Sequence, residues 1–199
     1  MKYTVYDLIT GEILRCGDAP SEWCELQAQN NDEALHIGFA FDANEFFFEG
    51  DVPVRKHVKP SPHHDWDWPT KSWLPNLNAA RASKLQQVAA ELNTRLHLPC
   101  NGFDADPVSR GRISGTIARL QRGDGLPAGW VGWRDASNQQ RWAEDDAMTV
   151  LANLTALSRA IEDREQALLT ASWQHKANLN ALEDFAAILS YDTTAGWPS

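Results

Sequence analysis

The sequence predicts an α+β fold: a small antiparallel β-module, then a linker rich in proline and tryptophan, then a mainly helical C-terminal domain. Three observations predict this order. Apolar and polar residues alternate with the period of a strand in residues 1–59, and four prolines interrupt residues 60–75. Apolar residues then recur every three or four positions in residues 76–199. The change of period at the proline block therefore predicts three segments with these boundaries.

The N-terminal segment begins with the pattern of a β-hairpin. Apolar residues alternate on both sides of Thr10-Gly11 in the stretch KYTVYDLITGEILRCG, and this pair is predicted to form the turn. Three phenylalanines at 46–48 form a second predicted strand, which a turn at 49–51 joins to the next. Because so short a module buries little apolar area, we expect residues 1–59 to dock onto another domain or chain.

The linker reads PSPHHDWDWPTKSWLP, and its prolines exclude a regular helix or a central strand. Trp66, Trp68 and Trp73 are candidate interaction residues within it, because tryptophan often anchors protein contacts. An aromatic platform for a sugar is the alternative. The favoured interpretation is an aromatic staple in a hinge, which fixes two modules or two subunits.

Two helices with defined ends are predicted after the linker. The first, in NLNAARASKLQQVAAELNTRLHLP, ends before Pro99. The second begins with Asp106 as N-cap and Pro107 at the first helical position, and it stops at Gly123. Residues 130–142 then predict a β-hairpin, whose three tryptophans are expected to cover the base of the following helix.

The C-terminal region 144–190 contains neither proline nor glycine, and its apolar residues recur at near-heptad spacing. It is predicted to form one very long helix, or two in tandem. A stripe of that length is not expected to be covered within so small a module, so Ile161, Leu168 and Leu179 are candidate interaction residues. We therefore expect a coiled-coil homo-oligomer, or capture of a helix from a partner.

Composition narrows the functional classes. The net charge is −9 and no apolar run is long enough to span a bilayer, so neither a nucleic acid nor a membrane is expected as a partner. The N-terminus lacks the apolar core of a signal peptide, which favours synthesis in the cytoplasm. The three cysteines, Cys16, Cys24 and Cys100, are expected to be buried free thiols in that compartment.

No residue pattern predicts catalysis or metal binding. His63, His64 and Asp65 are adjacent and point in alternating directions in an extended chain, whereas the ligands of one metal ion usually come from separated positions. Nucleophile-elbow, phosphate-loop and dinucleotide-binding motifs are absent, and the acidic clusters at 144–146 and 162–165 fit helix starts and solvated helix faces. We assign no catalytic, cofactor-binding or metal-ligating residue, and do not expect an enzyme.

The order of elements resembles that in tail genes of tailed bacteriophages. The resemblance is carried by the start Y-x-V-Y-D-x-x-T-G-E-I-L-R-x-G, by the proline segment with its TKSW, and by GWVGWRDASNQQRWAEDDAMTVLANL. The region 80–190, with FDADPVSRGRISGTIARLQ and the Trp133-Arg134-Asp135 triplet, is similar to uncharacterised domains of phage tail-fibre and tail-fibre-assembly proteins.

This resemblance implies a structural component of the virion tail, made in the host cytoplasm, that attaches to or bridges tail, baseplate and fibre subunits. Its partners would be other tail or fibre proteins. Because tail fibres are usually threefold, a homotrimer is expected before a dimer. A tail-fibre assembly chaperone that is absent from the mature virion is the alternative, and a receptor- or glycan-binding module that uses the linker tryptophans is a third. No catalytic residues are implied.

Overall fold

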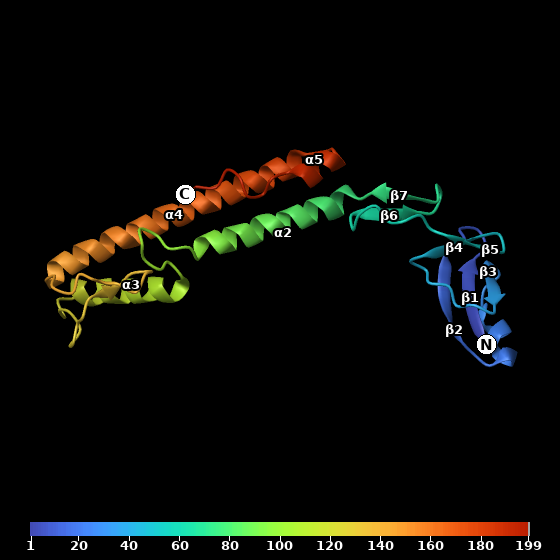
Figure 1. The fold of residues 1–199 in the computed structure, drawn as a ribbon, viewed down its shortest axis with the longest axis horizontal. Coiled ribbons are helices and arrows are strands. Elements are labelled where there is room, and N and C mark those ends of the chain that lie inside the picture. Colours follow the sequence, from blue (N-terminus) through green and yellow to red (C-terminus); the bar gives the residue numbers. More distant parts are fainter. Residues whose placement is uncertain (199) are drawn as a thin grey trace. The chain divides into compact units, whose positions relative to one another are not determined.

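The computed structural model describes residues 1–198 and divides the chain into two compact units, Met1–Leu77 and a unit that begins at Asn78 (Figure 1). The first unit is built mainly of antiparallel strands and the second mainly of helices, which confirms the predicted α+β class. The unit boundary lies at the start of the first long helix. Residues 60–75 therefore belong to the β-rich unit rather than standing between two domains. None of the helices in the described part of the chain is long and apolar enough to cross a membrane.

A three-stranded antiparallel sheet forms the centre of the first unit, with strand order β2-β1-β3. The strands β1 (Lys2–Asp7) and β2 (Ile13–Asp18) form the predicted hairpin, with a register shift between Val5 and Tyr6. β3 (Glu33–Ile37) pairs with the other edge of β1, after a short helical segment made of α1 (Ser21–Cys24) and η1 (Glu25–Gln27).

A second hairpin, β4 (Phe46–Glu49) with β5 (Val52–Arg55), supplies the aromatic core of this unit. The rings of Phe48 and Tyr6 stack with centroids 3.9 Å apart. Burial, together with the hydrogen bond that the Tyr6 hydroxyl donates to Asp51, raises the pKa of Tyr6 to about 12.

The turn at Gly11 requires glycine. Its φ is +74°, and the Phe48 amide donates to the Gly11 carbonyl at 2.9 Å. A Cβ atom at Gly11 would lie 1.9 Å from the Phe48 carbonyl oxygen, so only glycine allows the two hairpins to approach this closely.

An ion pair joins the two edge strands across β1. Arg15 on β2 contacts both carboxylate oxygens of Glu33 on β3, whose side chain is largely buried. The Arg15 guanidinium is the main cause that lowers the pKa of Glu33 to about 2, and the Gln29 amide adds to it. The ionised form of Glu33 therefore stabilises this sheet.

Residues 60–75 were predicted to be a linker without a regular helix or a central strand, and the structure shows a hairpin of two edge strands there. β6 (His64–Asp67) and β7 (Ser72–Pro75) form an antiparallel hairpin in this segment. The prolines do not prevent pairing because Pro60, Pro62 and Pro69 lie outside the strands and Pro75 ends one. Both strands of a two-stranded sheet are also edge strands, which tolerate proline.

The helical unit begins with α2 (Leu77–Leu96) and α3 (Pro107–Gln121), which stop and start where the sequence predicts. The Asp106 carboxylate caps α3 by accepting hydrogen bonds from the amides of Val108 and Ser109, and Pro107 opens the helix. Gly123, with φ +83°, follows its end.

The long helix α4 (Ala147–Ala181) is the element on which the rest of this unit packs (Figure 1). Arg110 of α3 pairs with Glu165 near its middle. Arg164 donates to the carbonyls of Leu98 and Pro99 at 2.6 Å each, just after the end of α2. α4 thus holds α3 along its first half and the end of α2 near its middle.

The region 144–190 does not form a single helix. It forms two helices in tandem, which was the alternative prediction. Leu182 has extended backbone angles, and Asp184 caps a separate helix α5 (Phe185–Ser190) by accepting from the Ala187 amide. Arg81 of α2 donates to the carbonyls of Leu179 and Leu182 at the end of α4, and the Leu179 carbonyl also accepts from the Leu182 amide. Side chains rather than glycine or proline therefore end this helix.

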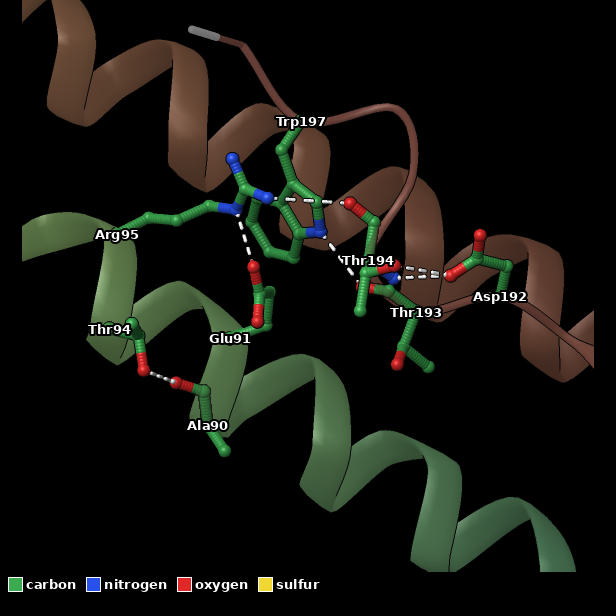
Figure 2. Close-up of polar contacts among 8 residues, drawn as sticks. All are labelled: Ala90, Glu91, Thr94, Arg95, Asp192, Thr193, Thr194 and Trp197. Atoms are coloured by element: carbon green, nitrogen blue, oxygen red, sulfur yellow. Dashed lines mark hydrogen bonds and ion pairs between the residues drawn. The ribbon is translucent and has the colours of Figure 1, made fainter.

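The C-terminal tail after α5 lies against α2 and α4 (Figure 2). The Trp197 indole N–H donates to the Thr193 carbonyl at 2.9 Å, and its ring lies 4.9 Å from the ring of the buried His175 of α4. The Arg95 guanidinium of α2 is 5.6 Å from the same Trp197 ring and also donates to the Thr194 carbonyl. These contacts attach the tail to both helices.

Candidate functional site

The structure brings together the three tryptophans that the sequence singled out. Trp66 and Trp73 are directly paired across β6 and β7, with ring centroids 5.2 Å apart. Trp68 lies 6.2 Å from Trp66 in the turn that follows, and Phe47 of β4 lies 5.4 Å from Trp66. The aromatic cluster, meaning Trp66, Trp68, Trp73 and Phe47, therefore joins the third hairpin to the second.

Lysines of the same unit cover the faces of these rings. The Lys56 ammonium is 5.0 Å from the Trp66 ring and 4.7 Å from the Trp68 ring, and Lys59 is 5.1 Å from the Trp73 ring. Burial lowers the pKa of Lys56. Cations of the chain therefore already lie over these rings. Whether the aromatic cluster also binds a sugar stays a prediction. Whether it contacts a protein partner stays a prediction.

The predicted oligomerisation stripe on α4 is covered by the chain itself. Ile161, Leu168 and Leu179 are 4%, 2% and 0% exposed. Ile161 lies in one hydrophobic cluster with Ile113 and Leu120 of α3. The argument that an uncovered stripe forces self-association is therefore wrong, because these three side chains are already buried within the single chain. Self-association through another surface stays a prediction.

A second candidate site, which the sequence did not predict, lies beside the β8–β9 hairpin of the helical unit. β8 (Trp133–Arg134) and β9 (Gln140–Arg141) form a shorter hairpin than the predicted 130–142, and a cavity of about 430 Å³ opens between it and the start of α3. Its lining includes two tryptophans, two arginines, an aspartate and an asparagine: Trp130, Trp133, Arg112, Arg134, Asp104 and Asn138.

Buried Asp135 builds the hairpin that forms one wall of this cavity. Its carboxylate accepts from the amides of Ser137 and Gln139 at 2.9 Å each and from Arg141 Nε at 2.8 Å. The Gln139 amide is the first cause of the lowered pKa of Asp135, with Arg141 and the Ser137 amide contributing. Gly132 has a φ of +94°, and a Cβ atom at this position would lie 2.5 Å from the carbonyl oxygen of Arg141. The close approach of these two backbone segments therefore requires glycine.

The tryptophans of this hairpin pack on the base of α4, as predicted. Trp130, Trp133 and Trp142 are half-buried against the cluster that holds Val150 and Leu154. The Trp130 indole N–H donates to the Trp142 carbonyl at 3.1 Å. The cavity is therefore attached to the hydrophobic core rather than to a loose loop.

Metal ligands do not gather in the described residues: no three His, Cys, Asp or Glu side chains lie close enough to hold an ion. His63 lies just before β6 and His64 begins it. All three cysteines are free thiols, and Cys24 and Cys100 are buried as expected, whereas Cys16 is exposed because it lies on an edge strand.

The second unit coincides with a recognised protein family. A family model described as Domain of unknown function (DUF4376) matches residues 79–195, more than half of the chain, and the chain belongs to this family. The match begins within α2, covers α3 to α5 with the cavity, and ends in the tail before Trp197. No curated protein and no solved structure matches the chain.

Proposed function

We propose that this protein is a structural component of a bacteriophage tail that bridges two other tail, baseplate or fibre proteins, one through each unit. The tail setting rests on the sequence resemblance described above. The bridging role is supported by the division of the chain into two compact units.

The two units differ strongly in charge, and this observation carries the bridging role. Residues 1–77 hold thirteen acidic and six basic residues, whereas residues 78–199 hold fourteen and twelve. Complementary charge steers association and discriminates between partners. The acidic first unit is therefore complementary to a partner with a basic surface. The second unit is nearly balanced in charge and is complementary to a different partner.

Exposed apolar side chains of the first unit support protein contact there. Trp23 and Leu26, which lie three residues apart in the helical segment before β3, are 59% and 69% exposed. Val58, beside the aromatic cluster, is 91% exposed. Tryptophan in particular is over-represented among residues that dominate binding energies. Self-association into a trimer, which the threefold symmetry of tail fibres favours, belongs to the same proposal.

Mass spectrometry of purified particles from a phage that carries this gene tests the location. We expect the chain in gradient-purified particles at a constant ratio to a known tail protein. Presence in the lysate with absence from the particles would refute the virion role and favour an assembly chaperone. Light scattering of the purified chain tests the trimer, and a monomer at high concentration would contradict it.

A further inference from the structure

The cavity beside the β8–β9 hairpin has two arginines without a partner. Within residues 1–198, the guanidinium group of neither Arg112 nor Arg134 makes a hydrogen bond or an ion pair, and both residues are exposed at the cavity. Other arginines of the same region are engaged: Arg110 by Glu165, Arg122 by Asp124, and Arg141 by Asp135. The cavity thus presents two free guanidinium groups, which prefer a carboxylate or a similar planar anion.

The other polar groups of the cavity limit the charge of a ligand. Asp104 also lacks a partner within residues 1–198, and the Asp135 charge is balanced by Arg141. Two free arginines and one free aspartate leave a single positive charge. A monoanion therefore fits better than a phosphate with two charges, and Asp104 can accept hydrogen bonds from hydroxyl groups.

Two tryptophans, Trp130 and Trp133, line the cavity. The Trp130 and Trp133 rings have centroids 6.5 Å apart and are inclined by 44°, and both lie in the lining. The Trp130 N–H is bound to the Trp142 carbonyl, whereas the Trp133 N–H has no acceptor in the described chain. A ring-shaped ligand can stack on an indole face while the Trp133 N–H and the Asn138 amide bind its oxygens.

We propose that this cavity binds an acidic sugar of the hexuronic acid class. Its carboxylate would lie between Arg112 and Arg134, its ring on a tryptophan face, and its hydroxyls against Asp104 and Asn138. The volume of about 430 Å³ is within the range of small-ligand sites. An acidic peptide fits less well, because Asp104 repels a second carboxylate. The site does not depend on the virion role, since the residues that form it lie in the helical unit alone.

Titration of the full chain with sodium glucuronate tests this site. We expect saturable binding, measured by calorimetry and by shifts of the Trp130 and Trp133 indole N–H signals in NMR spectra. Glucose, which lacks the carboxylate, should bind at least about tenfold more weakly, since a charged hydrogen bond contributes more than a neutral one. The peptide Gly-Glu-Gly supplies a carboxylate without a sugar ring and should also bind more weakly.

Charge-neutral variants locate the site. Arg112→Gln and Arg134→Gln should each weaken glucuronate binding by about tenfold or more, because each removes one charged donor. Arg159→Gln, on an exposed position of α4 away from the cavity, is the matched control and should leave binding unchanged. All three variants should keep the helical circular dichroism of the parent.

Absence of glucuronate binding, equal binding of glucose, or tighter binding of the peptide would overturn the proposal. So would an equal loss of binding in the Arg159 control, which would indicate a diffuse charge effect.

Discussion

Replacing Ile161 by alanine distinguishes a core residue of this chain from an interface residue. The side chain is 4% exposed and lies in the cluster that joins α3 to α4. Truncation of a buried isoleucine to alanine costs about 2–5 kcal/mol through lost contacts and the cavity left behind. Against a urea dependence of about 2 kcal/mol per molar, the unfolding midpoint should fall by about 1–2.5 M.

The assay is urea unfolding followed by the helical far-UV circular dichroism, which reports the second unit because the long helices lie there. Met148→Ala is the control: Met148 lies on the same helix but is 74% exposed, so its truncation should change stability by less than about 0.5 kcal/mol. The difference in midpoint between Ile161→Ala and the parent should be the same at every protein concentration, because the substitution acts within one chain. An unchanged midpoint for Ile161→Ala, together with a smaller particle mass by light scattering, would refute the assignment of Ile161 to the core.

Three further outcomes are expected. Because the pKa of Glu33 falls from 4.5 to about 2 on folding, its ion pair stabilises the first unit fully above pH 4.5, and this is lost as the pH falls toward 2. Glu33→Gln should flatten the pH dependence of stability in this window, and an unchanged slope would contradict the assignment. Gly11→Ala should destabilise the first unit by about 2 kcal/mol or more, since overpacking adds to a strained φ, whereas Gly50→Ala, with open space around it, should cost about 1 kcal/mol. Hydrogen exchange of the β1–β2 amides measures the loss of stability in both variants. Equal losses would contradict the close approach of Gly11 to Phe48. Trp197→Ala should lower the urea stability of the helical unit by about 1–2 kcal/mol, because half-buried apolar area returns to water. If a protease cuts the C-terminal tail no faster in this variant than in the parent, the result contradicts the anchoring role of Trp197.

Local signals in the sequence predicted most of the elements. The Asp106-Pro107 start and the Gly123 stop fix α3 because capping and backbone preference act within a few residues. The β1–β2 hairpin follows in the same way from its alternation and its turn. By contrast, the pairing of β3 with β1 joins distant residues, and no local pattern records it.

The errors have a physical origin in the same difference between local and distant contacts. Proline composition indicated a linker at 60–75, but the position of each proline relative to the strands decides whether pairing is possible. The stripe through Leu168 was predicted to need a partner to cover it, which is wrong, because the period alone does not say whether the covering surface belongs to the same chain. The cavity at Arg112 and Arg134 depends on the folded position of two segments that are distant in the sequence, and no local pattern predicted it.

The bridging role is tested most directly by lysine cross-linking within intact, purified particles, read by mass spectrometry. The first unit offers Lys2 and Lys59 and the second offers Lys84 and Lys176, so cross-links from the two units are distinguishable. We predict cross-links from Lys2 or Lys59 to one tail protein, and from Lys84 or Lys176 to a different one. Cross-links from both units to the same protein, or absence of the chain from the particles, would contradict the account.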